Sequence, residues 1–255
     1  MTNWTTIGGP LGGVRRPGSG PRLALLHGFT QTGRSWGPLV DLLPADADVW
    51  CPDAPGHGDS GHTRVDLGTA ARMLVETVGA GRYVGYSMGG RTALRAALDH
   101  PAVVESLVLI GASAGIADKI ERARRVADDE RLANDIERDG VDVFLESWLA
   151  GPLFVSLSPE AANVDDRRRN DAGGLAASLR LMGTGAQEPL WERLGEARRP
   201  LHVVVGENDQ KFVEVGRRLV ASWGGPTRMT VVPGAGHAVH LERPHEVAAI
   251  LAGGT

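Results

Sequence analysis

Short apolar runs alternate with segments of helical periodicity over most of this chain, and this alternation restricts the fold more than any other feature. The apolar runs end in turn residues and are typical of buried strands, which we expect at 22–26, 48–51, 83–86, 103–110, 201–206 and 229–232. Helical spacing predicts helices at 36–43, 88–99, 212–223 and 237–251. Strands that alternate with helices in this way form βαβ units, so we expect an α/β fold with a mostly parallel central sheet flanked by helices.

The alternation stops between residues 115 and 195. Segments 116–138, 141–149 and 175–181 are charged or amphipathic with helical spacing, and no convincing buried strand lies between them. We therefore predict a core of residues 1–114 and 196–255, with a helical cap of residues 115–195 inserted after the sixth strand. The stretch 7–20 is rich in glycine and proline, so any strands there should be short.

Composition narrows the classes of partner. The chain has 255 residues, 42% of them hydrophobic, which is enough to bury a sizeable core. A net charge of -4 argues against nucleic acid or an anionic membrane as the main partner. No signal-like segment or long apolar window is present, and a single cysteine, Cys51, cannot form an internal disulfide. We expect a cytoplasmic protein, a monomer or weak homo-oligomer, with no stable membrane association and neither a cofactor nor a metal.

The pentapeptide 85–89, Gly-Tyr-Ser-Met-Gly, matches the nucleophile-elbow pattern, in which a serine occupies a sharp turn between a strand and a helix. Its context agrees, because an apolar strand precedes Ser87 and a helical segment follows it. The amino-terminal dipole of that helix points at the reaction centre. We therefore interpret Ser87 as the nucleophile or base.

A serine hydroxyl needs a histidine to take its proton and a carboxylate to orient that histidine. Asp209 follows the strand that ends at Gly206, and His237 follows the last strand. Ser, Asp, His is the chain order of the α/β-hydrolase fold. Both residues fall beyond the carboxyl ends of strands, where open α/β sheets place their ligand sites.

Two substitutes remain open for this triad. His240 lies three residues after His237, and Glu207 lies two residues before Asp209. Asp53 also follows a strand, but we expect it to support a turn. A developing oxyanion needs preorganised donors, and the backbone amides of Phe29 and Met88 are the natural pair.

These motifs resemble the α/β-hydrolase superfamily over nearly the whole chain. The residues that carry the resemblance are HGFT at 27–30, PDAPGHGDS at 52–60, YSMGGR at 86–91 and GH at 236–237. Finer detail in both cap and core is similar to the 2-succinyl-6-hydroxy-2,4-cyclohexadiene-1-carboxylate synthases of menaquinone biosynthesis. This second resemblance rests on GENDQKF at 206–212, WLAGPLF at 148–154, GLAASLR at 174–180, GTG at 183–185 and GHAVHLE at 236–242.

The resemblance implies a carbon-oxygen lyase that eliminates pyruvate from a cyclohexene carboxylate carrying succinyl and enolpyruvyl groups, with the triad as base. Such a polycarboxylate needs fixed cations in its pocket, and arginine suits bidentate carboxylate binding. The site residues implied by the family are Tyr86, Arg91, Trp148 and Lys211, together with one arginine from 122–125 and one from 167–169. Spacing favours Arg125 and Arg167 there, with Arg124 and Arg168 as close alternatives.

Two other functions stay open at this stage. A serine hydrolase of esters or of ring-cleavage carbon-carbon bonds would use the same triad, although a neutral ester needs no cluster of arginines. A non-catalytic ligand receptor on the same scaffold would keep the pocket and need no competent triad. Only Lys119 and Lys211 are lysines among 27 basic residues, so most arginines are expected to reflect composition rather than function.

Overall fold

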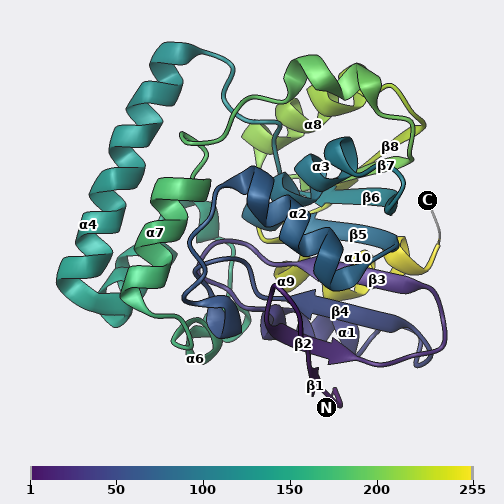
Figure 1. The fold of residues 1–255 in the computed structure, drawn as a ribbon. Helices are drawn as coiled ribbons and strands as arrows, with labels where there is room; N and C mark the ends of the chain where they lie inside the picture. Colours follow the sequence, from purple (N-terminus) through teal and green to yellow (C-terminus); the bar gives the residue numbers. More distant parts are fainter. Residues whose placement is uncertain (1, 254–255) are drawn as a thin grey trace.

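The computed structural model of this protein describes residues 2–253, so the outermost residues of the predicted core segments, 1 and 254–255, lie outside it. Eight strands form one sheet in the order β1-β2-β4-β3-β5-β6-β7-β8 (Figure 1). The strands are β1 (Thr5–Thr6), β2 (Gly13–Arg16), β3 (Arg22–Leu26), β4 (Asp48–Pro52), β5 (Gly81–Tyr86), β6 (Val104–Ile110), β7 (Leu201–Gly206) and β8 (Thr227–Val232). Only the pairs β1–β2 and β2–β4 are antiparallel, so the predicted α/β fold with a mostly parallel sheet is confirmed.

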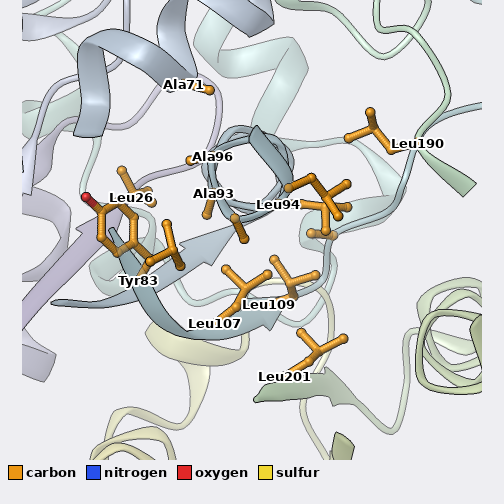
Figure 2. Packing of buried hydrophobic residues seen from close by; sticks show 14 of the residues in the cluster. Leu26, Ala71, Tyr83, Ala93, Leu94, Ala96, Leu107, Leu109, Leu190 and Leu201 are labelled. Carbon is orange, nitrogen blue, oxygen red and sulfur yellow. The ribbon is translucent and has the colours of Figure 1, made fainter. Parts of the chain in front are cut away.

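Helices cover both faces of the sheet, as Figure 1 shows. The core helices are α1 (Gly37–Val40), α2 (Leu67–Val78), α3 (Met88–Asp99), α8 (Gln210–Ser222), α9 (Val239–Glu242) and α10 (Pro244–Ala252). Side chains alternate between the faces of a strand. Leu107 and Leu109 therefore join the cluster under α2, α3 and α8, whereas Val108 and Ile110 join the cluster under α1, α9 and α10. Figure 2 shows the first cluster, in which Leu107 and Leu109 lie beside the α3 residues Ala93 and Leu94.

Between β6 and β7 the chain is helical, without a strand in the described residues. Its elements are α4 (Lys119–Leu149), η3 (Pro152–Phe154), α5 (Pro159–Ala162), α6 (Val164–Arg167), α7 (Ala172–Met182) and η4 (Trp191–Glu196). Helices α4 and α7 pack together beside the sheet (Figure 1). Gly140 breaks α4 with φ 82°, which explains why the sequence predicts two separate helices there.

Some expected helices differ from those observed. The segment 36–43 is helical only to Val40, preceded by the 3₁₀ turn η1 (Gly33–Trp36), and the segment 237–251 is split at Arg243 because Pro244 starts a new helix. Helix α2 was not predicted, although Asp66 caps it and its apolar residues have helical spacing. In residues 2–253, none of the helices combines the length and apolar composition that a membrane span requires.

Candidate active site

Ser87 lies at a sharp turn between β5 and α3. Its backbone has φ 49° and ψ -109°, a conformation that L-residues rarely adopt. The flanking glycines allow the close packing this turn needs. A Cβ on Gly85 would lie 2.5 Å from the carbonyl oxygen of Gly89, and one on Gly89 would lie 2.2 Å from that of Leu26. The turn thus presents the Ser87 side chain at the carboxyl edge of the parallel sheet.

Asp209 and His237 reach this serine from the loops after β7 and β8, the last two strands of the sheet. His237 Nε2 is 3.4 Å from Ser87 Oγ, and His237 Nδ1 is 2.6 Å from Asp209 Oδ2. The side chains of His237 and Asp209 are only 3% and 10% exposed, so water competes little for their hydrogen bond. Nδ1–H donates to the carboxylate, which leaves Nε2 free to accept the serine proton. A separation of 3.4 Å is typical of an unliganded site, where such contacts shorten when substrate binds.

The two substitutes considered for the triad are engaged elsewhere. His240 is fully buried, with its ring 4.4 Å from the ring of Trp36 and 4.3 Å from that of Tyr86. Burial holds the pKa of His240 well below its usual value, so it stays neutral. Glu207 instead accepts a hydrogen bond from the amide of Gly234. Neither side chain forms a hydrogen bond to Ser87 within the described residues.

Asp53 supports turns, in agreement with its expected role. Its carboxylate accepts hydrogen bonds from the amides of Gly33 and Asp59. The contact with Asp59 closes the loop after β4, and the contact with Gly33 ties that loop to η1. Asp53 therefore supports turns and does not line the cavity above Ser87.

Phe29 and Met88 both line the cavity above Ser87. Met88 is the first residue of α3, where a helix amide has no intrahelical acceptor. Phe29 lies in the loop after β3. In residues 2–253 neither backbone amide donates a hydrogen bond to another protein group. Two residues of the cavity lining thus each have a free backbone donor, which is what the stabilisation of an oxyanion requires.

A cavity of about 490 Å³ lies between these groups and the helices α4 and α7. Six of the predicted binding residues line it: Tyr86, Arg91, Arg125, Trp148, Arg167 and Lys211. Arg218 of α8 also lines it and was not predicted; its guanidinium lies 3.8 Å from the ring centre of Trp191. Nothing in the sequence indicates this residue, because the chain is rich in arginine and the position of Arg218 in α8 does not show that it faces the cavity.

Two of the cavity arginines are buried without a carboxylate partner. Arg91 donates to the carbonyl of Met182 at 2.7 Å and to Oε1 of Gln187 at 3.0 Å. Arg167 is 2% exposed and donates to the carbonyl of Ala162 and the hydroxyl of Thr30. Among the described residues neither guanidinium forms a salt bridge, and burial lowers the pKa of each. Buried cations held by neutral acceptors suit a site that receives an anion.

Arg125 and Lys211 differ from this pair. Arg125 forms a salt bridge to the buried carboxylate of Asp129 at 2.8 Å, so part of its charge is already balanced. Lys211 is exposed at the start of α8, with its ammonium 5.9 Å from the ring centre of Phe212. Arg125 therefore belongs to the wall formed by α4, and the exposed Lys211 lies at the edge of the cavity.

The alternatives Arg124 and Arg168 do not reach the cavity. Arg124 is exposed on α4, and the exposed Arg168 pairs with Asp142 and Asp165. Consecutive residues of a helix point about 100° apart, so one member of an arginine run faces the site while its neighbour faces solvent. For these two arginines the expectation of a binding role is corrected.

Aromatic side chains form the remaining walls. Tyr86 is buried, its ring 5.3 Å from that of His237, and burial raises the pKa of its hydroxyl. Trp148 packs edge-on to Phe29 at 5.4 Å. Its indole nitrogen is buried and has no hydrogen-bond partner within residues 2–253. Trp148 therefore contributes mainly the apolar surface of its ring to the cavity wall.

Comparison with known proteins agrees with this geometry. A sequence model described as the alpha/beta hydrolase family matches residues 23–250. A protein from Citrobacter koseri named 2-succinyl-6-hydroxy-2,4-cyclohexadiene-1-carboxylate synthase is 35% identical over 93% of this chain and 94% of its own length. A protein of the same name from Enterobacter sp. is 33% identical over 91% of this chain and 90% of its own.

A solved structure extends this likeness to three dimensions. The structure of MenH from S. aureus superposes with a TM-score of 0.87 at 25% identity, and the match covers 99% of this chain and 97% of that one. The agreement therefore includes the helices between β6 and β7 as well as the sheet. The chain belongs to the alpha/beta hydrolase family, and within it to the branch of the 2-succinyl-6-hydroxy-2,4-cyclohexadiene-1-carboxylate synthases.

Proposed function

We propose that this protein is a carbon-oxygen lyase that eliminates pyruvate from a succinyl- and enolpyruvyl-substituted cyclohexene carboxylate, giving 2-succinyl-6-hydroxy-2,4-cyclohexadiene-1-carboxylate. One observation carries the proposal: a Ser87–His237–Asp209 arrangement opens into a cavity whose buried arginines lack carboxylate partners. Relatives that share a third of the sequence bear the name of this activity. A small polycarboxylate substrate would supply the missing negative charge.

In the proposed reaction the three side chains act as one base. His237, oriented by Asp209, takes the hydroxyl proton of Ser87, and the serine oxygen takes the ring proton next to the succinyl ketone. The electrons of that C–H bond form the new ring double bond as the C–O bond to the enolpyruvyl group breaks. The ring double bond already present shifts by one position in the same step, so that its electrons expel the enolpyruvyl oxygen and the 2,4-diene results. The leaving enolpyruvate takes the proton held by His237 at carbon to become pyruvate, which returns the triad to its starting state.

Negative charge develops on the succinyl ketone oxygen during proton removal. The free amides of Phe29 and Met88 would donate to this oxygen, and the dipole of α3 adds to their effect. Preorganised donors of this kind contribute about 10²–10³-fold each in other enzymes. The same amides would serve a tetrahedral intermediate, so they are compatible with an esterase as well.

The substrate of the lyase carries several carboxylates, whereas a neutral ester carries none and needs no cationic pocket. We propose that the carboxylates bind to cationic residues and that aromatic side chains form the apolar walls. The cationic residues are Arg91, Arg125, Arg167 and Lys211, and the aromatic residues are Tyr86 and Trp148. In this proposal the cap of residues 115–195 provides Arg125, Trp148 and Arg167, and the core of residues 1–114 and 196–255 provides the rest. We place the reaction in the cytoplasm.

The test compares two substrates on one preparation. Purified protein should release pyruvate, measured with lactate dehydrogenase and NADH, from the freshly generated pathway intermediate, and should turn over a small aryl ester far more slowly. An Arg91→Ala variant should lose most pyruvate release and keep its residual ester turnover. Preferential ester turnover would favour the hydrolase, and tight binding of the intermediate without any turnover would favour a receptor.

A further inference from the structure

Gln187 is a buried polar residue in the segment between α7 and η4, only 2% exposed. Its Oε1 accepts a hydrogen bond from Nη1 of Arg91 at 3.0 Å, and the same nitrogen also donates to the carbonyl of Met182. These two oxygens are the acceptors of Arg91 in the described part of the chain. Both are neutral, so they orient the guanidinium without cancelling its charge.

The nearby carboxylate of Asp129 is paired with another arginine. Asp129 forms its salt bridge with Arg125 at 2.8 Å, and Arg91 has no salt bridge within residues 2–253. Burial and the charge of Arg125 lower the pKa of Arg91 to about 10 although Asp129 acts in the opposite direction, so Arg91 stays charged at neutral pH. A buried cation without a directly bonded carboxylate is costly, and a ligand carboxylate in the cavity would relieve that cost.

The chemistry of the amide fixes which way Gln187 points. Arginine offers only donors, so the carbonyl oxygen of Gln187 must face Arg91. Its amide nitrogen then points the other way, near Gly115, and has no hydrogen-bond partner in the described residues. A glutamate of the same shape would place a full negative charge against Arg91.

We propose that Gln187 is a positioning residue that holds Arg91 in the cavity wall and, because it is neutral, reserves the arginine's charge for a carboxylate of the ligand. This inference rests on the proposed function only in taking the ligand to be a polycarboxylate. Gln187 does not line the cavity itself, so it acts through Arg91. A neutral acceptor at this position thus makes the site selective for anions.

The test uses succinate as a probe and measures its affinity by titration calorimetry in low salt. Gln187→Glu should weaken succinate binding at least tenfold, because the new carboxylate takes the charge-assisted hydrogen bonds of Arg91. Arg91→Ala should weaken it similarly. Adding Gln187→Glu to Arg91→Ala should change the affinity less than twofold, because Gln187 acts only through Arg91.

Gln187→Met is the matched control for packing, since it keeps the volume, removes the acceptor and leaves Arg91 charged. Gln187→Met should weaken succinate binding only about threefold. If Gln187→Glu does not fold, Gln187→Met is combined with Arg91→Ala instead, and the combination should again change the affinity less than twofold relative to Arg91→Ala alone. If Gln187→Met and Gln187→Glu both fold and lose the same amount of succinate affinity, the charge of residue 187 does not matter and the proposal is refuted. Wild-type affinity in Gln187→Glu would also refute it, as would an undiminished effect of Gln187→Glu in the Arg91→Ala background. Absence of succinate binding by the wild-type protein would refute it as well.

The role of Gln187 and the lyase reaction can be refuted independently of each other. Succinate binding requires no elimination chemistry, so a wild-type protein that binds succinate and releases no pyruvate would refute the lyase while leaving the role of Gln187 intact. If pyruvate is released, Gln187→Glu should raise KM at least tenfold and change kcat less than threefold. A loss confined to kcat would contradict a role in carboxylate binding.

Discussion

The backbone of Ser87 stores strain that a single substitution should release. With φ 49° and ψ -109°, Ser87 occupies a region that a residue with a Cβ rarely enters, at a cost of about 1–3 kcal/mol. Ser87→Gly removes the Cβ and therefore this cost. Ser87→Ala is the matched control, because it removes the same hydroxyl and keeps the Cβ.

The expected gain is smaller than the strain itself. Glycine gives the unfolded chain extra conformational freedom, which subtracts about 0.4–1 kcal/mol from the stability. Loss of the hydroxyl does not affect the difference between the two variants, because both lack its 3.4 Å contact with His237. From the middle of both ranges, we expect the free energy of unfolding of Ser87→Gly to exceed that of Ser87→Ala by roughly 1.3 kcal/mol, which corresponds to roughly 3–5 °C in Tm.

Equilibrium unfolding in urea, followed by far-ultraviolet circular dichroism, measures this difference, and calorimetry gives the two Tm values. Both variants should be inactive, so stability would rise as function is lost. A Ser87→Gly variant that is no more stable than Ser87→Ala would refute the claim that this turn is strained.

Three further predictions concern the groups around the site. Asp209→Asn should lower kcat about 10⁴-fold, measured by pyruvate release, because the amide favours the wrong tautomer of His237. Glu242 accepts from both backbone amides that flank His237, so Glu242→Gln should cost about 1–2 kcal/mol in urea unfolding, whereas the exposed Glu246→Gln should cost nothing measurable. Burial lowers the pKa of His57 to about 3, so only the unfolded chain gains a proton there below about pH 6.5. His57 alone should then lower the free energy of unfolding by about 1.4 kcal/mol per pH unit between pH 6 and 3, and His57→Gln should lack this part of the slope.

The sheet and the arrangement around Ser87 were predictable because local patterns determine both. Buried parallel strands are apolar on both faces, so runs such as 201–206 are visible in the sequence. Asp209 and His237 follow the ends of such strands, and parallel strands bring their carboxyl ends to one edge. Chain order and sheet topology therefore suffice to bring distant residues together at Ser87.

The side of the site formed by the helices between β6 and β7 depends on how those helices pack, which the sequence does not show. Arg167 and Arg168 are adjacent residues of the same type, and the sequence does not show which of them faces the cavity. Arg167 is buried in the cavity wall, whereas Arg168 pairs with exposed acidic residues. Gln187 belongs to no motif and becomes meaningful only through its distance to Arg91. Helix α2 is different, because the cap at Asp66 and the apolar spacing that follows it were present in the sequence.

We propose that Ser87 removes the ring proton in a cavity whose cationic side chains bind the substrate carboxylates. Pyruvate release from the freshly generated intermediate, followed in a single turnover with enzyme in excess, tests this most directly when wild type is compared with Ser87→Ala. We expect the wild-type protein to release one pyruvate per substrate and Ser87→Ala to slow release by at least 10³-fold with succinate affinity unchanged. Release by Ser87→Ala at a near wild-type rate would contradict this proposal.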